Sequence, residues 1–550
     1  MTARKVGDPM RMTNKIMQNN SLYNINQNKV LQDKLSTQMS TNKKLTRPSD
    51  DPVIAIRALR LRSSVSELTQ YHDKNSPDAE SWLKVTSDGL GTVTEILTDL
   101  NRNANKGANK DLTPDDIEII VTNMKSLAQE FYSTGNLDYA GRYVFTGYRT
   151  DTPMSFTSSD VSNIVDLIPD YNITEQTDIA AFDKINYTTL DQLEGVNKNN
   201  YTAISEADSE EQNIKNCDIH RLRLAYNNTA GTDGSTTDVT IDLLNHNADK
   251  TTTSVPDTGY ASITPTTVSN ASTPNPYEQI RQADEAGDEL VIYVPETGEI
   301  LFSEASYTAM TTRTGFTTET EIQVNYSKQG KSFVNGDLRP EHYFACTTYE
   351  QGTTNKMVDY NASYLDPAVG KQKQVIAYDV GYNQTIEINT TADEVFTHDL
   401  NRDITDLMNA LNTLQDVYAS KIDLENELKN MEDTNPNYAL LTKQVDAINK
   451  AYDYVRENMH TKLEQTISKT QRYLDTTNVA VTDNGTRLSR LELIDNRLTE
   501  QKTTFRTLQS ENEDIDIADV ATQLTSAELT YSSSLMATGK ILQTTLMNYI

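Results

Sequence analysis

Apolar residues recur at helical spacing at both ends of this chain, and this pattern constrains the fold more than any other feature. Near the C-terminus, steps of three and four residues connect Ile517, Val520, Leu524, Ala527, Tyr531, Leu535, Thr538, Leu542, Leu546 and Tyr549. A sparser stripe near the N-terminus comprises Leu22, Ile25, Leu31, Leu35 and Met39. Such spacing places side chains on one face of an α-helix. Because both stripes are narrow, each helix buries too little surface alone, and we expect it to pack against a partner.

The middle of the chain has a different character from its ends. Residues 12–145 and 399–550 are predicted to be helical, whereas residues 150–395 show strand-like alternation and turn signals, including a hairpin over 290–302 that turns at Glu296, Thr297 and Gly298. Before the C-terminal stripe, alternating steps of three and four predict a coiled-coil seam of Leu491, Ile494, Leu498, Gln501, Phe505 and Leu508. The sequence therefore predicts a mainly α fold with a β-rich insert. In it, paired N- and C-terminal segments form a discontinuous helical rod with coiled-coil-like termini.

Adjacent carboxylates in the segment RPSDDP mark a helix start. Pro52 fits the first helical position, and it keeps Asp51 in the extended conformation that an N-cap requires. The same pattern recurs at Thr113 and Pro114, where Asp116 completes a capping box. Neighbouring residues on a helix do not face one site, so Asp50 and Asp51 are not interpreted as metal ligands.

The roles of Pro77, Arg487 and Arg490 each allow two interpretations. Pro77 either restarts a helix with Ser76 as its cap or kinks a continuing helix. Arg487 and Arg490 either pair with acids of a neighbouring helix or lie solvated beside the seam, and the second interpretation is favoured because exposed ion pairs contribute little.

The charge balance and the absence of catalytic motifs exclude several classes of function. Lys and Arg number 49 against 79 Asp and Glu, a net charge of −30 that disfavours nucleic-acid binding. The chain has no run of eighteen apolar residues and no secretory leader pattern, which argues against membrane insertion and Sec-type export. Its two cysteines and six histidines show no metal-ligand spacing, and no phosphate-loop or hydrolase motif occurs. We therefore predict no catalytic, cofactor-binding or metal-binding residues, and no enzymatic activity.

Several segments in the same order resemble the flagellin superfamily. They include the stretch from Met10 through RPSDDP, AESWL from Ala79, GRYVFTGYRTDTPMSF from Gly141 and NGTRLSRLE from Asn484. The positions that carry this family motif are Pro48, Ser49, Asp50, Asp51, Pro52, Arg487 and Arg490. By this resemblance, residues 10–45 with 512–550 form a terminal helical assembly domain and residues 46–150 with 395–511 form a helical rod domain. Residues 151–394 then form a β-rich surface insert, and residues 1–9 are an extension outside the match.

The resemblance implies a structural component of the bacterial flagellum that acts in motility, as the junction between hook-side proteins and the flagellin filament. Alternatives are flagellin itself and a filament-displayed adhesive protein. Family members leave the cell through the flagellar type III apparatus without a cleaved signal. The implied partners are other copies of the chain in a helical assembly, the neighbouring hook-associated protein, flagellin and an export chaperone, and no cofactor is expected. The residues expected to pack between subunits are Leu22, Ile25, Leu31, Leu35, Met39, Val520, Leu524, Tyr531, Leu535, Leu542 and Leu546.

Overall fold

A computed structural model describes residues 14–163, 168–190, 193, 195–229, 239–255 and 262–543. Contacts within the chain group the residues into two units. The terminal unit comprises the chain up to residue 79, residues 378–386 and the chain from residue 489 onward. The central unit comprises residues 80–377 and 387–488.

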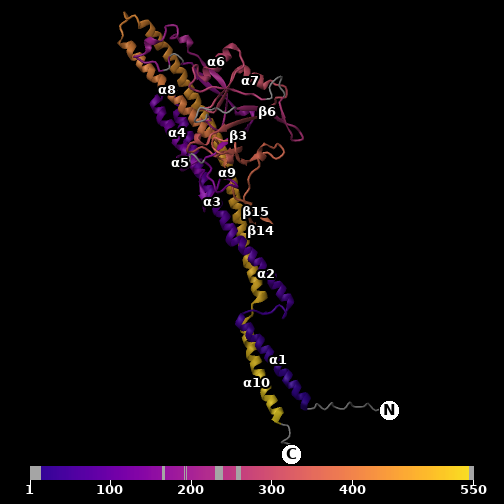
Figure 1. The fold of residues 1–550 in the computed structure, drawn as a ribbon. Coiled ribbons are helices and arrows are strands. Elements are labelled where there is room, and N and C mark those ends of the chain that lie inside the picture. Colours follow the sequence, from indigo (N-terminus) through magenta and orange to yellow (C-terminus); the bar gives the residue numbers. More distant parts are fainter. Residues whose placement is uncertain are drawn as a thin grey trace, which may run out of the picture. The chain divides into compact units, whose positions relative to one another are not determined.

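Helices make up most of the terminal unit. They are α1 (Asn14–Thr41), α2 (Pro52–Gln70), the start of α3 (Ser76–Gly107), the last part of α9 (Tyr438–Glu513) and α10 (Ile517–Gln543). Helices α1 and α10 lie side by side, so the two ends of the chain pair with each other (Figure 1).

Local sequence signals account for where these helices begin. Asp51 has extended φ and ψ of −151° and 100°, and its Oδ1 accepts hydrogen bonds from the backbone N–H groups of Val53 and Ile54 at 3.0 and 3.2 Å. The predicted N-cap is confirmed. Ser76 is not a cap, because its backbone is α-helical; the chain instead passes from α2 into α3 through a π-helical turn, Tyr71–Asn75. A π turn shifts the hydrogen-bond register by one residue, which is how the helix passes the missing N–H of Pro77.

The predicted seam in the last part of α9 is only partly buried. Leu491, Ile494 and Leu498 are buried, whereas Gln501 is exposed and Leu508 is 44% exposed. Leu508 thus lies outside the part of the seam that a single chain buries. Coiled-coil pairing of these helices stays a prediction.

The long helices of the central unit are residues 80–107 of α3, α4 (Pro114–Thr134), α8 (Asp399–Asn430) and the part of α9 up to residue 488. The capping box at Thr113 is confirmed, with reciprocal hydrogen bonds between Thr113 and Asp116. Trp82 is 1% exposed, and Leu90, Leu97 and Phe131 are also buried. Residues 135–145, which were predicted to be helical, leave the helix after Thr134 and include two short strands instead, β1 (Asp138–Tyr139) and β2 (Arg142–Tyr143).

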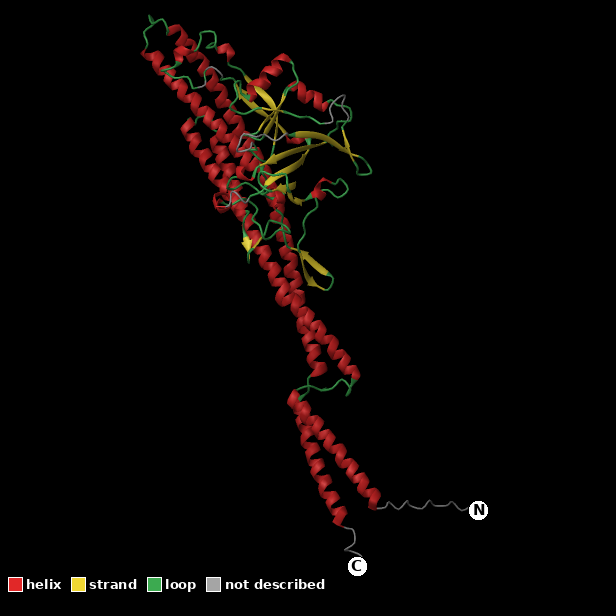
Figure 2. Ribbon diagram, in the orientation of Figure 1, coloured by secondary structure: helices red, strands yellow, loops and turns green. Residues whose placement is uncertain are grey.

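Two sheets form the β-rich part of the central unit, and Figure 2 shows them beside the helices of the same unit. The five-stranded sheet has the order β4 (Phe182–Thr188), β5 (Asn216–Arg223), β10 (Glu299–Phe302), β9 (Val291–Val294), β8 (Thr266–Thr267). The six-stranded sheet has the order β13 (Lys356–Tyr360), β12 (Ala345–Tyr349), β3 (Asp170–Thr177), β11 (Glu321–Lys328), β6 (Thr240–His246), β7 (Thr252–Ser254). The short helices α5 (Ser158–Asn163), α6 (Pro276–Ala286) and α7 (Glu304–Thr311) connect strands. A further pair of strands, β14 (Ala377–Gly381) and β15 (Gln384–Glu387), falls mostly in the terminal unit. A mainly α fold with a β-rich insert is therefore present.

The predicted hairpin is confirmed, because β9 pairs antiparallel with β10. Gly298 has φ +64°, and a Cβ at this position would lie 2.0 Å from the carbonyl oxygen of Tyr226. Only glycine fits there. The loop predicted after Tyr226 falls mostly on residues 230–238, which lie outside the described residues.

Buried ion pairs join the five-stranded sheet to the helices of the central unit. Arg221 of β5 contacts Asp183, Glu299 and Asp406 at 2.6, 2.5 and 2.9 Å. Arg223 contacts Asp403 of α8 at 2.9 Å. Burial alone would raise the pKa of Asp406, but the two arginines outweigh this and hold the pKa far below its ordinary value. The sheet is thus attached to α8 by charge as well as by apolar packing.

Candidate assembly surface on the terminal helices

A small apolar seam joins α1 to α10. Leu35, Val520 and Ala527 are 4%, 7% and 6% exposed and pack with Ile515 and Leu524. Ile25 of α1 and Thr538 of α10 are each 9% exposed. The seam contains few apolar residues, so its burial stabilises the α1–α10 pair only to a limited extent.

Only part of the predicted packing set lies in this seam. Ile25, Leu35 and Val520 are buried, and Leu524 and Tyr531 are half-buried. The exposed members are Leu22, Leu31, Leu535 and Met39, at 55%, 47%, 46% and 38%. The side chain of Leu542, and Leu546 as a whole, lie outside the described residues.

Polar residues explain why the predicted α1 stripe does not coincide with the α1–α10 seam. The face of α1 toward α10 runs from Ile25 through the half-buried Asn28 and Gln32 to Leu35, in steps of three, four and three. Asn28 donates a hydrogen bond from Nδ2 to Oγ of Ser534 in α10 at 3.4 Å. The sequence pattern instead passed from Ile25 to Leu31, and a step of six residues turns the side chain away from the seam.

A second apolar stripe lies on the outer face of this helix pair, and sequence reasoning missed it. Ile16, Tyr23 and Val30 of α1 are seven residues apart and are 49%, 64% and 64% exposed. Leu529 and Met536 of α10 are also seven residues apart and are 70% and 67% exposed. At about 100° per residue, both sets lie roughly opposite the seam of their own helix. We call these five residues the outer stripe; their seven-residue spacing was the signal that could have found them.

Charged residues fix the chain where α1 and α10 begin to pair. Asn42 ends α1 in the left-handed conformation, φ +56°, and its carbonyl accepts from the N–H of Ile515 at 3.3 Å. Arg62 of α2 donates two hydrogen bonds to Glu513, at 2.7 and 2.6 Å, and Lys43 contacts the same carboxylate at 3.3 Å. Burial works to raise the pKa of Glu513, yet the bonds from Arg62 and Lys43 hold it below the ordinary value.

The family-motif residues have mainly structural roles. Pro48 and Ser49 lie in a turn in which the N–H of Asp50 donates to the carbonyl of Arg47 at 3.0 Å, and Asp51 and Pro52 start α2. Arg487 is engaged, contrary to the favoured interpretation. It donates to the carbonyl of Asn389 at 2.7 Å, and it pairs with Glu387 at 3.3 Å and with Asp483 on its own helix. Arg490 is exposed, and no ion pair involves it within the described residues.

Asn484, at the start of the motif NGTRLSRLE, was not singled out by sequence reasoning. It is 1% exposed and donates to the carbonyl of Leu83 at 3.0 Å, so it ties α9 to α3 inside the central unit.

Neither metal nor membrane features stand out in the part of the chain that the structure describes. Among these residues, no three His, Cys, Asp or Glu side chains are grouped to hold a metal ion. None of the described helices combines the length and apolar character needed to cross a membrane.

Comparison with known proteins first defines the class of the N-terminal helical region. Residues 12–150 match the family model of the bacterial flagellin N-terminal helical region. The flagellin resemblance found in the sequence is thereby confirmed for this part of the chain.

Particular relatives within that class are flagellar hook-associated proteins. The chain is 28% identical over 143 residues to flagellar hook-associated protein 3 of Salmonella typhimurium, covering 26% of this chain and 45% of the relative. It is also 28% identical over 144 residues to the protein of the same name from Escherichia coli, with the same coverage. The chain thus spans about half the length of the curated relatives that it matches.

Solved structures with some likeness also come from flagellar proteins. A putative flagellar hook-associated protein from Vibrio parahaemolyticus matches 84% of this chain and 100% of its own, at 13% identity and a TM-score of 0.32. Hook-associated protein 3 from Legionella pneumophila matches 82% of this chain and 97% of its own, at 9% identity and a TM-score of 0.29.

Proposed function

We propose that this chain is a structural, non-enzymatic component of the bacterial flagellum that joins hook-side proteins to the flagellin filament. The observation that carries the proposal is the outer stripe. A helix pair with a thin inner seam and an exposed apolar face on each helix gains burial by packing against other helices. The match to hook-associated protein 3 over 143 residues supports a place at the junction.

Assembly supplies the burial that a single chain lacks. Tyr23 and Val30 on α1 and Leu529 and Met536 on α10 are each at least 64% exposed. Fully burying a side chain of this size stabilises by about 1.5–3 kcal/mol, so several such contacts per subunit outweigh the entropy lost when a chain joins the structure. We assign the outer stripe to contacts between subunits, together with the exposed Leu22, Leu31, Met39 and Leu535.

The remaining features of the proposal follow from the resemblance. Residues 10–45 with 512–550 serve as the assembly domain, residues 46–150 with 395–511 as the rod, and residues 151–394 as a surface insert. The chain is exported through the flagellar type III apparatus with the help of a chaperone. It then assembles outside the cell with copies of itself, the neighbouring hook-associated protein and flagellin. In the assembly, the terminal helices pair as a coiled coil.

Immunogold electron microscopy of flagellated cells that produce the chain tests this proposal. A junction protein gives one narrow band of label per flagellum, at the end of the hook. Label along the whole filament would show that the chain is a flagellin instead, and label away from the flagellum would overturn both assignments.

A further inference from the structure

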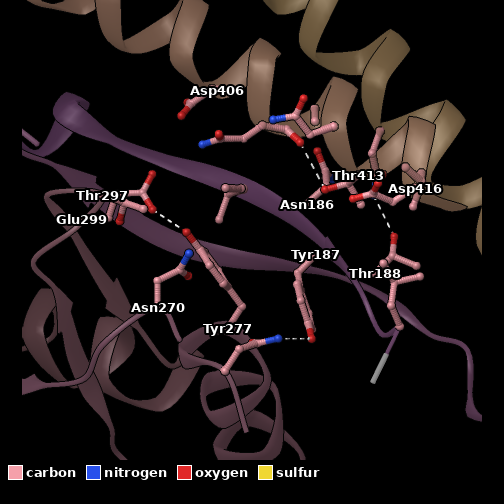
Figure 3. Close-up of a pocket in the computed structure, with 18 of the residues that line it drawn as sticks. Asn186, Tyr187, Thr188, Asn270, Tyr277, Thr297, Glu299, Asp406, Thr413 and Asp416 are labelled. Atoms are coloured by element: carbon pink, nitrogen blue, oxygen red, sulfur yellow. Dashed lines mark hydrogen bonds between the residues drawn. The ribbon is translucent and has the colours of Figure 1, made fainter. Parts of the chain in front are cut away.

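A cleft of about 1190 Å³ lies in the central unit, between the five-stranded sheet and helices α8 and α9. Figure 3 shows residues Asp406, Thr413 and Asp416 on the helix side and Tyr187 and Tyr277 on the opposite side. Ligand pockets in proteins usually measure about 300–1,000 Å³, so this volume suits a ligand of several rings rather than a single small group. All of its walls belong to the central unit, so binding there is independent of the terminal helices.

Three polar side chains without hydrogen-bond partners among the described residues line the helix wall of the cleft. Asn409, Asn412 and Asp416 follow one another on α8 at steps of three and four, which puts them on one face. All three are exposed and line the cleft. Within the described residues, none of their side chains has a hydrogen-bond partner. Asn409 and Asn412 therefore offer amide donors and acceptors to a bound molecule, and Asp416 offers carboxylate acceptors.

The opposite wall carries two aromatic rings that are held in place. Tyr187 of β4 and Tyr277 of α6 are stacked, with ring centroids 5.8 Å apart and planes inclined by 18°. Asn275 donates to the hydroxyl of Tyr187 at 3.1 Å, and the hydroxyl of Tyr277 donates to Glu299 at 2.6 Å. Fixed rings offer a flat apolar surface with polar edges at a low entropic cost.

Charges in the cleft are largely balanced. Glu299 and Asp406 both pair with Arg221, at 2.5 and 2.9 Å. The two other carboxylates that line the cleft are Glu296 and Asp416, and the lining also includes the cations Arg402 and Lys462. Four carboxylates therefore stand against the three cations Arg221, Arg402 and Lys462, so a strongly charged ligand of either sign finds little excess of opposite charge there.

We propose that this cleft binds a neutral oligosaccharide of about three sugar rings. A sugar ring has an apolar face of C–H groups that packs on an aromatic ring, and a rim of hydroxyls that both donate and accept hydrogen bonds. The fixed tyrosines match the first property, and the unpaired amides of α8 match the second. The near neutrality of the lining favours an uncharged ligand over a cationic peptide or a phosphorylated one.

Titration calorimetry and saturation-transfer NMR on the full-length chain test the proposal with three neutral probes: cellotriose, maltotriose and chitotriose. Tetralysine serves as a charged probe. We expect at least one trisaccharide to bind, and Asn409→Leu to weaken that binding about tenfold or more, since it removes the amide at nearly constant volume. The matched control is Asn426→Leu, the same substitution at an exposed position of α8 that does not line the cleft, and it should bind as the unchanged chain does.

Two further results decide the outcome. Tetralysine should not bind measurably at millimolar concentration, because the proposed recognition is not ionic. The proposal is overturned if no trisaccharide binds at millimolar concentration, if Asn409→Leu and Asn426→Leu bind equally well, or if tetralysine alone binds and Asp416→Asn abolishes it. Unchanged circular dichroism melting of each variant shows that the comparison is made on folded protein.

Discussion

Replacing Val30 with glutamate separates assembly from folding. Val30 is 64% exposed and is the last residue of the α1 part of the outer stripe. Glutamate has a higher helix propensity than valine, so Val30→Glu should leave the helix of the free chain intact. A surface change of this kind normally alters stability by less than about 0.5 kcal/mol.

The effect on assembly should be much larger. Complete burial of a valine stabilises by about 1.5 kcal/mol, and with 64% of Val30 still exposed, about 1 kcal/mol remains to be gained when subunits pack. The variant loses this term and also brings an unpaired carboxylate into an apolar contact, at a cost of several kcal/mol. A combined loss of about 3 kcal/mol per contact weakens that contact more than a hundredfold, since 1.4 kcal/mol is a factor of ten.

Motility and immunogold labelling of cells that carry only the variant measure this effect. We expect flagella without the labelled band and the variant chain free in the medium. The control is Ser36→Glu, which adds the same charge at an exposed position of α1 about 120° around the helix from Val30. If Val30→Glu assembles normally, or if the control is equally defective, the outer stripe is not the contact between subunits.

Three other perturbations test the packing inside the chain. Leu35→Ala removes the most buried side chain of the α1–α10 seam and should cost about 2–3 kcal/mol, seen as faster hydrogen exchange in both helices with no change in the central unit. Asp403→Leu removes the 2.9 Å contact with Arg223, which keeps Asp406 at 3.1 Å, and also removes the contacts with Lys469 and Tyr473 at 2.6 and 2.8 Å, so it should cost about 3 kcal/mol in urea unfolding. Adding Arg223→Leu should restore the part of the loss that comes from their pair, and strictly additive losses would refute the coupling. Burial raises the pKa of Glu175 to about 7, so its contribution to stability is full below its ordinary value of 4.5 and is lost as the pH rises toward 7. Glu175→Gln should therefore remove part of the fall in stability between pH 5 and pH 8, and an unchanged pH profile would contradict this.

Features that depend on neighbouring residues alone were predictable from the sequence. The N-cap at Asp51, the capping box at Thr113 and the β9–β10 hairpin all follow from contacts within a few residues. Helix periodicity also separated the helical ends from the β-rich middle. These features are local because nearby side chains determine the backbone geometry of a helix cap or a turn.

Only the tertiary structure decided which helix faces meet and which residues from distant segments share a site. The sequence pattern favoured Leu31 for the seam, yet the helix turns Asn28 and Gln32 toward α10, because each residue adds about 100° of rotation whatever its polarity. The cleft likewise brings together Tyr187, Tyr277 and Asn409, which lie up to 222 residues apart, as their numbers show. No local sequence pattern predicts that these residues lie close together, because their proximity depends on how distant strands and helices pack in the folded chain.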